Sequence, residues 1–157
     1  MEKKVKQTKK VSKKSAAVPF EMVHPTCAGI DVGASKHYVA VHPTLSENAV
    51  RCFDTHTQGI EDLASWLLSL GIESVVMEST GVYWQTLYEL LESKGFKVCL
   101  ANAHHVRHVP GRKTDVKDSQ WLQQLHSFGL LQPSFIPEAQ VRELRSYLRL
   151  RHQYIED

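Results

Sequence analysis

Short apolar runs along the chain predict five β-strands. Residues 26–32 (TCAGIDV) form an apolar run typical of a buried strand, and residues 37–41 and 49–53 add two more strand-like segments. Two further short runs, residues 74–77 and 96–100, are rich in valine and leucine. The sheet-forming part of the chain therefore begins near residue 26 and ends near residue 100.

Helical periodicity fills the gaps between the later strands. Residues 58–70 place apolar side chains on one face and precede Gly71, and residues 82–93 repeat that pattern before Gly95. In the second segment we expect four side chains to point inward: Tyr83, Leu87, Leu90 and Leu91. A third helix is predicted from about Asp115 to Phe128, and a last one from Glu138 onward.

The order of these elements predicts an α/β fold. Three closely spaced strands favour antiparallel pairing, and the later strand–helix–strand units favour parallel pairing. We expect a mixed five-stranded sheet flanked by helices, the order typical of a ribonuclease H-like domain. The predicted division is a disordered basic tail (1–22), the domain itself (23–132) and the start of a helical, coiled-coil-like linker (133–157).

Composition is that of one soluble domain. Of 157 residues, 42% are hydrophobic and 23% are charged, and no apolar run is long enough for a membrane span or a secretory signal. The three cysteines, Cys27, Cys52 and Cys99, form no CxxC pair, which indicates buried free thiols and a cytoplasmic protein. Residues 1–14 contain seven lysines, which suit either a nucleic-acid-binding arm or a solvated tail.

Four acidic residues are the candidate chemical site. Asp31 and Glu78 each end an apolar strand, where a charge is costly unless something compensates it. Asp115 and Asp118 lie three apart at a helix start, and we expect both to point towards the sheet edge. Converging carboxylates suit Mg²⁺ and two-metal phosphodiester chemistry. Any one acid alone could instead be structural, such as a turn cap or a first-turn residue.

These residues lie in segments with a familiar pattern. The segments CAGIDVGASKHYVAV, ESTG followed by a helix, and GRKTDVKD resemble RuvC-like DEDD transposases of insertion sequences, namely the IS110 family and the Piv-type DNA invertases. The resemblance covers residue 24 to the end. It implies a ribonuclease H-like fold, magnesium (or manganese as a substitute), DNA recombination and a structured guide RNA. It maps the family's four acids onto Asp31, Glu78, Asp115 and Asp118.

The resemblance also carries one departure. Relatives continue through a coiled-coil linker into a C-terminal domain that supplies a serine nucleophile, whereas this chain ends at Asp157. We therefore expect these residues to be inactive for recombination by themselves.

Basic residues provide candidate nucleic-acid contacts. The segment 104–117, expected to be a loop, contains Arg107, Arg112, Lys113 and Lys117. The last helix has heptad-spaced apolar positions that suggest self-association, and it carries Arg142, Arg145 and Arg149 mostly off that stripe. A solvated surface is the alternative in both places.

Two other functions remain open at this point. The segment beginning at Asp31 (DVGAS) resembles the first phosphate loop of sugar kinases and actin-like ATPases, although no second such loop follows. The chain could also be a non-catalytic nucleic-acid-binding or assembly module with a relict site. Tight ATP binding would favour the ATPase, and failure to bind metal would favour the non-catalytic module.

Overall fold

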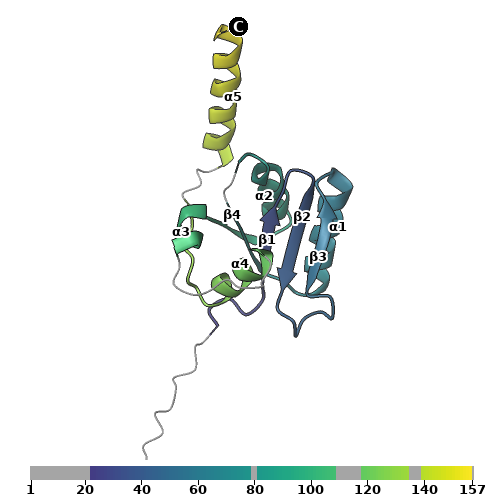
Figure 1. Cartoon of the computed structure of the whole chain (residues 1–157). Coiled ribbons are helices and arrows are strands. Elements are labelled where there is room, and N and C mark those ends of the chain that lie inside the picture. Colours follow the sequence, from purple (N-terminus) through teal and green to yellow (C-terminus); the bar gives the residue numbers. More distant parts are fainter. Residues whose placement is uncertain (1–21, 79–80, 109–117, 135–138, 157) are drawn as a thin grey trace, which may run out of the picture.

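A five-stranded mixed sheet forms the centre of the molecule (Figure 1). The computed structural model describes residues 22–78, 81–108, 118–134 and 139–156. The strands are β1 (Cys27–Val32), β2 (Lys36–Val41), β3 (Val50–Asp54), β4 (Ser74–Glu78) and β5 (Lys97–Ala101), in the spatial order β3-β2-β1-β4-β5. β1, β2 and β3 pair antiparallel, whereas β1, β4 and β5 pair parallel. The prediction of a mixed sheet is confirmed.

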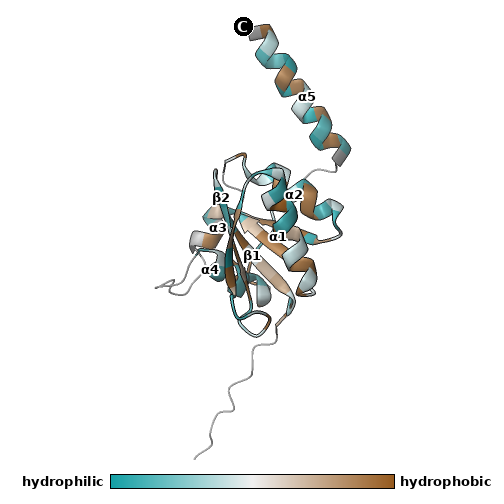
Figure 2. Cartoon of the chain, turned by 90° about the vertical axis from the view of Figure 1, so that its right-hand side faces the viewer, coloured by the Kyte–Doolittle hydropathy of each residue, from teal (hydrophilic) through white to brown (hydrophobic). Residues whose placement is uncertain are grey.

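Helices cover both faces of this sheet. The helices are α1 (Thr57–Ser69), α2 (Trp84–Ser93), α3 (Ala103–His108), α4 (Asp118–Ser127) and α5 (Ala139–Glu156). Figure 2 shows α1 and α2 on one side of the sheet and α3 and α4 on the other. The predicted disordered tail, residues 1–22, lies outside the described residues except for its last residue.

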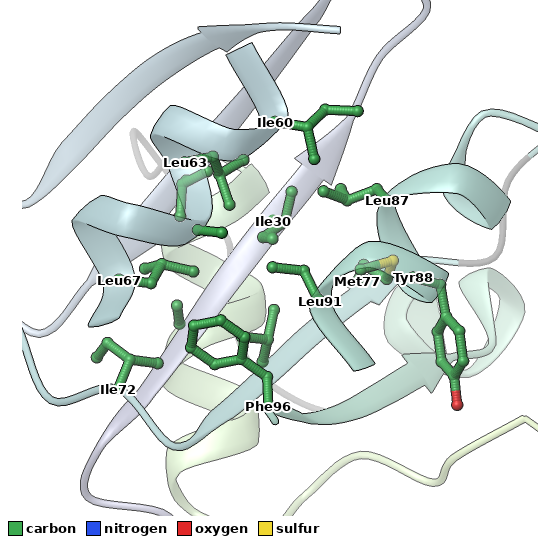
Figure 3. Packing of buried hydrophobic residues seen from close by; sticks show 14 of the residues in the cluster. Ile30, Ile60, Leu63, Leu67, Ile72, Met77, Leu87, Tyr88, Leu91 and Phe96 are labelled. Carbon is green, nitrogen blue, oxygen red and sulfur yellow. The ribbon is translucent and has the colours of Figure 1, made fainter. Parts of the chain in front are cut away.

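Leucines and isoleucines fill the layer between the sheet and the first two helices (Figure 3). Ile30 of β1 and Met77 of β4 are register partners and are fully buried beneath Leu63 of α1 and Leu91 of α2. Burying side chains of this size contributes about 1.5–3 kcal/mol each. This layer fixes β1 and β4 side by side, which matters because both strands end in a candidate acid.

Two local predictions were wrong. Tyr83 is 55% exposed rather than inward, because α2 begins at Trp84, whose indole Nε1 donates a hydrogen bond of 3.1 Å to the Gly81 carbonyl oxygen. The segment expected to be a loop from residue 104 begins instead as helix α3. Asn102 caps that helix, since its side-chain oxygen accepts a hydrogen bond of 2.9 Å from the His104 amide.

Cysteine burial also differs from expectation. Cys27, Cys52 and Cys99 are free thiols on strands, as predicted, but Cys52 is exposed on the edge strand β3 and Cys99 is only half-buried. Burial raises the pKa of the Cys27 thiol to about 11, so this thiol stays protonated and packs as an apolar group.

Helix α5 stands away from the two-sided sheet in both views (Figures 1 and 2). Its apolar positions Leu144 and Leu148 are exposed, so the structure of one chain does not confirm a coiled coil. None of the described helices is long and apolar enough to cross a membrane.

A histidine pair holds the segment before β1 against α4. The His126 ring stacks on the His24 ring at a centroid distance of 4.4 Å, and its Nε2 lies 2.7 Å from the Ser74 hydroxyl. Burial, with a smaller contribution from the charge of His24, lowers the pKa of His126 to about 4. The folded protein therefore favours neutral His126.

This arrangement predicts acid sensitivity. A histidine titrates near pH 6.5 in the unfolded chain. Neutral His126 therefore contributes its full share to the free energy of unfolding above that pH, and this share declines as the pH falls towards 4. We expect this one group to account for a loss of at most about 3 kcal/mol in the free energy of unfolding across that interval. Urea denaturation at a series of pH values, compared with His126→Gln, measures the contribution. Equal pH slopes for the two proteins would contradict it.

Candidate metal-binding site at the carboxyl ends of β1 and β4

Asp31 and Glu78 lie at the same level on neighbouring parallel strands. Their preceding residues, Ile30 and Met77, are register partners, and each acid follows its partner directly. Paired residues of parallel strands point to the same face of the sheet. Both acids are half-buried. The sequence prediction placed each at a strand end, and the topology makes the two strand ends adjacent.

The two carboxylates face the layer that contains α4. Ile30 and Met77 belong to the core beneath α1 and α2, so the residues next to them point the other way. Val76, two residues before Glu78, packs with Leu122 of α4 on that opposite side. The acids are thus separated from the main core and directed towards the helix that carries Asp118.

Gly29 brings the start of α4 close to Asp31. A Cβ atom at Gly29 would lie 2.3 Å from the Ser119 carbonyl oxygen and 2.5 Å from the Gln123 nitrogen. Only glycine permits this approach of helix backbone to strand. Asp118 immediately precedes Ser119, and Gly29 lies two residues before Asp31. The close approach therefore brings the first turn of α4 to the part of β1 that carries Asp31.

A backbone hydrogen bond closes the turn that follows Asp31. The Gly33 amide donates to the Lys36 carbonyl oxygen over 3.1 Å, and a Cβ at Gly33 would come within 2.4 Å of that same oxygen. The main chain itself thus closes the turn between β1 and β2. Capping of this turn is therefore a weaker explanation for Asp31 than its place beside Glu78.

The remaining acids divide between described and undescribed segments. Asp118 is the first residue of α4 and is exposed, and a carboxylate there is favoured by the helix dipole. Asp115 lies outside the described residues. In the described part of the chain, no three histidine, cysteine or acidic side chains are close enough to hold a metal ion. A complete site would therefore need Asp115 or a movement of Asp118.

The chemistry of the donors nevertheless fits a hard cation. Asp31, Glu78 and Asp118 offer carboxylate oxygens, which Mg²⁺ and Mn²⁺ accept and which suit phosphodiester chemistry. Both strand acids are fixed by a rigid sheet, so a cation bound there would have a defined position relative to β1 and β4.

Some of the basic residues predicted to contact nucleic acid lie in described segments, and others do not. Arg107 falls within α3, whereas three others lie outside the described residues: Arg112, Lys113 and Lys117. Arg145 and Arg149 are exposed on α5.

Arg142 is partly buried where the start of α5 contacts α2. Its guanidinium forms a 3.0 Å ion pair with Glu92 of α2 and lies 5.1 Å from the centre of the Tyr88 ring. The interpretation of Arg142 as a DNA contact therefore competes with a role in joining α5 to α2.

Two residues of this region were not recognised as functional candidates from the sequence. In the sequence, Gly29 is one small residue in an apolar run. Its role in the close approach of α4 to β1 is visible only in the structure. Tyr38 is the antiparallel register partner of Asp31, a relationship that depends on the β1–β2 pairing. A glycine two positions before a strand-end acid was the available signal for the first.

A mixed five-stranded sheet with helices on both faces is consistent with a RuvC-like, ribonuclease H-like domain. A model of the transposase family DEDD_Tnp_IS110 matches residues 28–157. The chain belongs to this transposase family. A comparison with curated proteins found no match. The family match confirms the resemblance drawn from the sequence motifs and favours the transposase interpretation over the ATPase alternative.

Proposed function

We propose that this chain is the RuvC-like catalytic portion of a DNA transposase, acting on DNA phosphodiesters with bound magnesium. The observation that carries the proposal is the adjacency of Asp31 and Glu78 at the ends of neighbouring parallel strands in a chain of a transposase family. Strand ends of this kind are rigid, and two carboxylates of like charge repel unless a cation lies near them.

Four carboxylates would hold the cation, with Mn²⁺ as a substitute for Mg²⁺: Asp31, Glu78, Asp115 and Asp118. When bound, such a cation supplies Lewis-acid stabilisation of the phosphate oxygens and activation of the attacking oxygen. The chain's own contribution is positional. Asp31 and Glu78 fix the strand side of the site, and Asp118 contributes from the N-terminal end of α4, where the dipole favours its ionised form.

Basic residues would hold the nucleic-acid backbone. We assign that role to Arg107, Arg112, Lys113 and Lys117, which are close in sequence to Asp115 and Asp118, and to the exposed Arg145 and Arg149 of α5. These residues supply sequence-independent affinity, so they could contact either target DNA or a structured guide RNA.

Self-association through α5 is part of the same proposal. Leu144 and Leu148 lie four residues apart and are exposed, which is costly for a helix that stays alone in water. Sedimentation of the wild type should show an oligomer that a double substitution, Leu144→Ala and Leu148→Ala, dissociates. A wild type that stays monomeric at all concentrations would contradict this part.

The nuclease assignment predicts nicking of supercoiled DNA. A cation held by the four acids would supply activation of water for attack on a phosphodiester. Any nicking should require Mg²⁺ or Mn²⁺ and should be lost in Glu78→Gln. Glu73→Gln is the matched control, because Glu73 is exposed and immediately precedes β4, at the end of the strand opposite to Glu78.

Two outcomes would contradict this assignment. One is nicking that persists with a chelator or in Glu78→Gln. The other is a covalent protein–DNA adduct that disappears on substituting Ser35, Ser79 or Ser119, since that would make a serine within these residues the nucleophile.

A further inference from the structure

An exposed tyrosine lies beside Asp31 on the same face of the sheet. Tyr38 of β2 is the antiparallel register partner of Asp31 and is 42% exposed. Side chains of directly opposed residues point to the same face, with Cβ atoms about 4.5–5.5 Å apart. The phenol ring is therefore the immediate neighbour of the carboxylate on the side away from Glu78.

The surroundings of Tyr38 leave its ring accessible. On its other side its register partner is Cys52 of β3, which is also exposed. Lys36, two residues earlier on the same face, forms an exposed 3.0 Å ion pair with Asp54. Asp54 and Cys52 are the β3 register partners of Lys36 and Tyr38, so the four side chains lie near one another.

The cover provided by α4 ends just before this surface. Ala40, two residues after Tyr38, pairs with Gly29 and is buried, and Gly29 touches the α4 backbone. Among the described residues, α4 thus closes one end of the β1–β2 face, whereas Lys36 and Tyr38 at the other end are exposed. The exposed end is the one that carries Asp31.

Core packing does not account for a large aromatic side chain at this position. The exposed ring contributes little burial, and an aromatic residue on an open sheet face is a common platform for unpaired nucleic-acid bases. Every base has a π-face, so such stacking works without sequence preference. Neighbouring strands are about 4.8 Å apart. A base on Tyr38 would therefore belong to the nucleotide whose phosphate lies at Asp31, or to the next one.

We propose that Tyr38 positions DNA by stacking its ring on an unpaired base next to the phosphate that a cation bound by Asp31 and Glu78 would hold. This inference rests on the proposed function, because it takes that acidic pair as the site of phosphodiester chemistry. It adds one requirement to the proposed function, namely that the DNA strand is locally unpaired at the site.

Binding of a single-stranded DNA oligonucleotide containing 2-aminopurine tests the inference in the full chain with magnesium present. We expect Tyr38→Ala to weaken binding about tenfold and to abolish the quenching that stacking causes. Tyr38→Phe and Tyr38→Trp should bind within about twofold of wild type, because stacking needs the ring and not the hydroxyl. Tyr154→Ala is the matched control, since Tyr154 is more exposed and lies on α5. Tyr38→Thr, which retains a strand-forming residue, serves if the alanine variant does not fold.

Three results would overturn the inference. They are wild-type affinity in a folded Tyr38→Ala or Tyr38→Thr variant, a Tyr38→Phe variant as weak as Tyr38→Ala, and a dependence on Tyr38 seen only with an RNA strand of the same sequence. Failure of the proposed function is separable, because it appears as loss of Asp31-dependent metal binding. Intact metal binding without any effect of Tyr38 would remove this inference alone.

Discussion

Gly29→Ala should destabilise the protein by about 3 kcal/mol, at the upper end of the usual cost of overpacking a core. The added methyl group would collide with the Ser119 carbonyl oxygen and the Gln123 nitrogen, two backbone atoms of α4 that stand in the i to i+4 relationship of an α-helical hydrogen bond. Neither atom belongs to a flexible side chain, so the helix itself must move. Urea denaturation measures the change in the free energy of unfolding.

The consequence should extend beyond stability. A displaced α4 moves Asp118 relative to Asp31, so Gly29→Ala should also weaken divalent-metal binding under conditions where the variant stays folded. Gly71→Ala is the matched control. It places the same methyl group where nothing lies within 4 Å, and its cost should be only the left-handed backbone strain of about 1 kcal/mol. Equal stability of Gly29→Ala and the wild type would show that α4 does not pack on β1 as described.

Strand positions were predictable because each strand is a short apolar run with its own local signal. The five predicted strands match those in the structure to within one or two residues, and their order predicted the antiparallel and parallel halves of the sheet. Helix α3 was missed because His104 and Arg107 give it no apolar stripe, and its stability comes from the Asn102 cap and burial of Val106.

The candidate site was predictable in its strand acids but not in its geometry. Asp31 and Glu78 stand out in the sequence as charges that end apolar runs. That they are neighbours follows from the β1–β4 pairing, and that Tyr38 joins them follows from the β1–β2 register. These neighbour relationships depend on how the strands pair, so a local sequence pattern does not predict them. Asp115 lies outside the described residues, and Asp118 is exposed at the start of α4, so their predicted orientation towards the sheet edge stays a prediction.

Asp31→Asn should abolish most of the affinity for divalent metal. Removal of residues that merely orient metal ligands commonly costs 10- to 100-fold in affinity, and loss of a ligand should cost at least about as much. Asparagine keeps the shape of the side chain, so the fold should survive. Without metal, the variant should be no less stable than the wild type, because like charges on adjacent strands repel and the substitution removes one of them.

Thermal unfolding separates these two effects. Metal that binds only the folded state raises the melting temperature, so Mg²⁺ should stabilise the wild type but not Asp31→Asn. Asp62→Asn is the matched control, because Asp62 lies on α1, on the opposite side of the sheet, and accepts a hydrogen bond from Gln58. It should respond to metal as the wild type does.

Isothermal calorimetry with Mn²⁺ on the wild type, Asp31→Asn and Asp62→Asn tests the central claim most directly. The acidic-site account predicts binding to the wild type and Asp62→Asn, with affinity at least about tenfold weaker in Asp31→Asn. Binding that is equal in all three proteins would place the metal elsewhere. No binding to the wild type would indicate a nucleic-acid-binding or assembly module with a relict site, and would contradict the account.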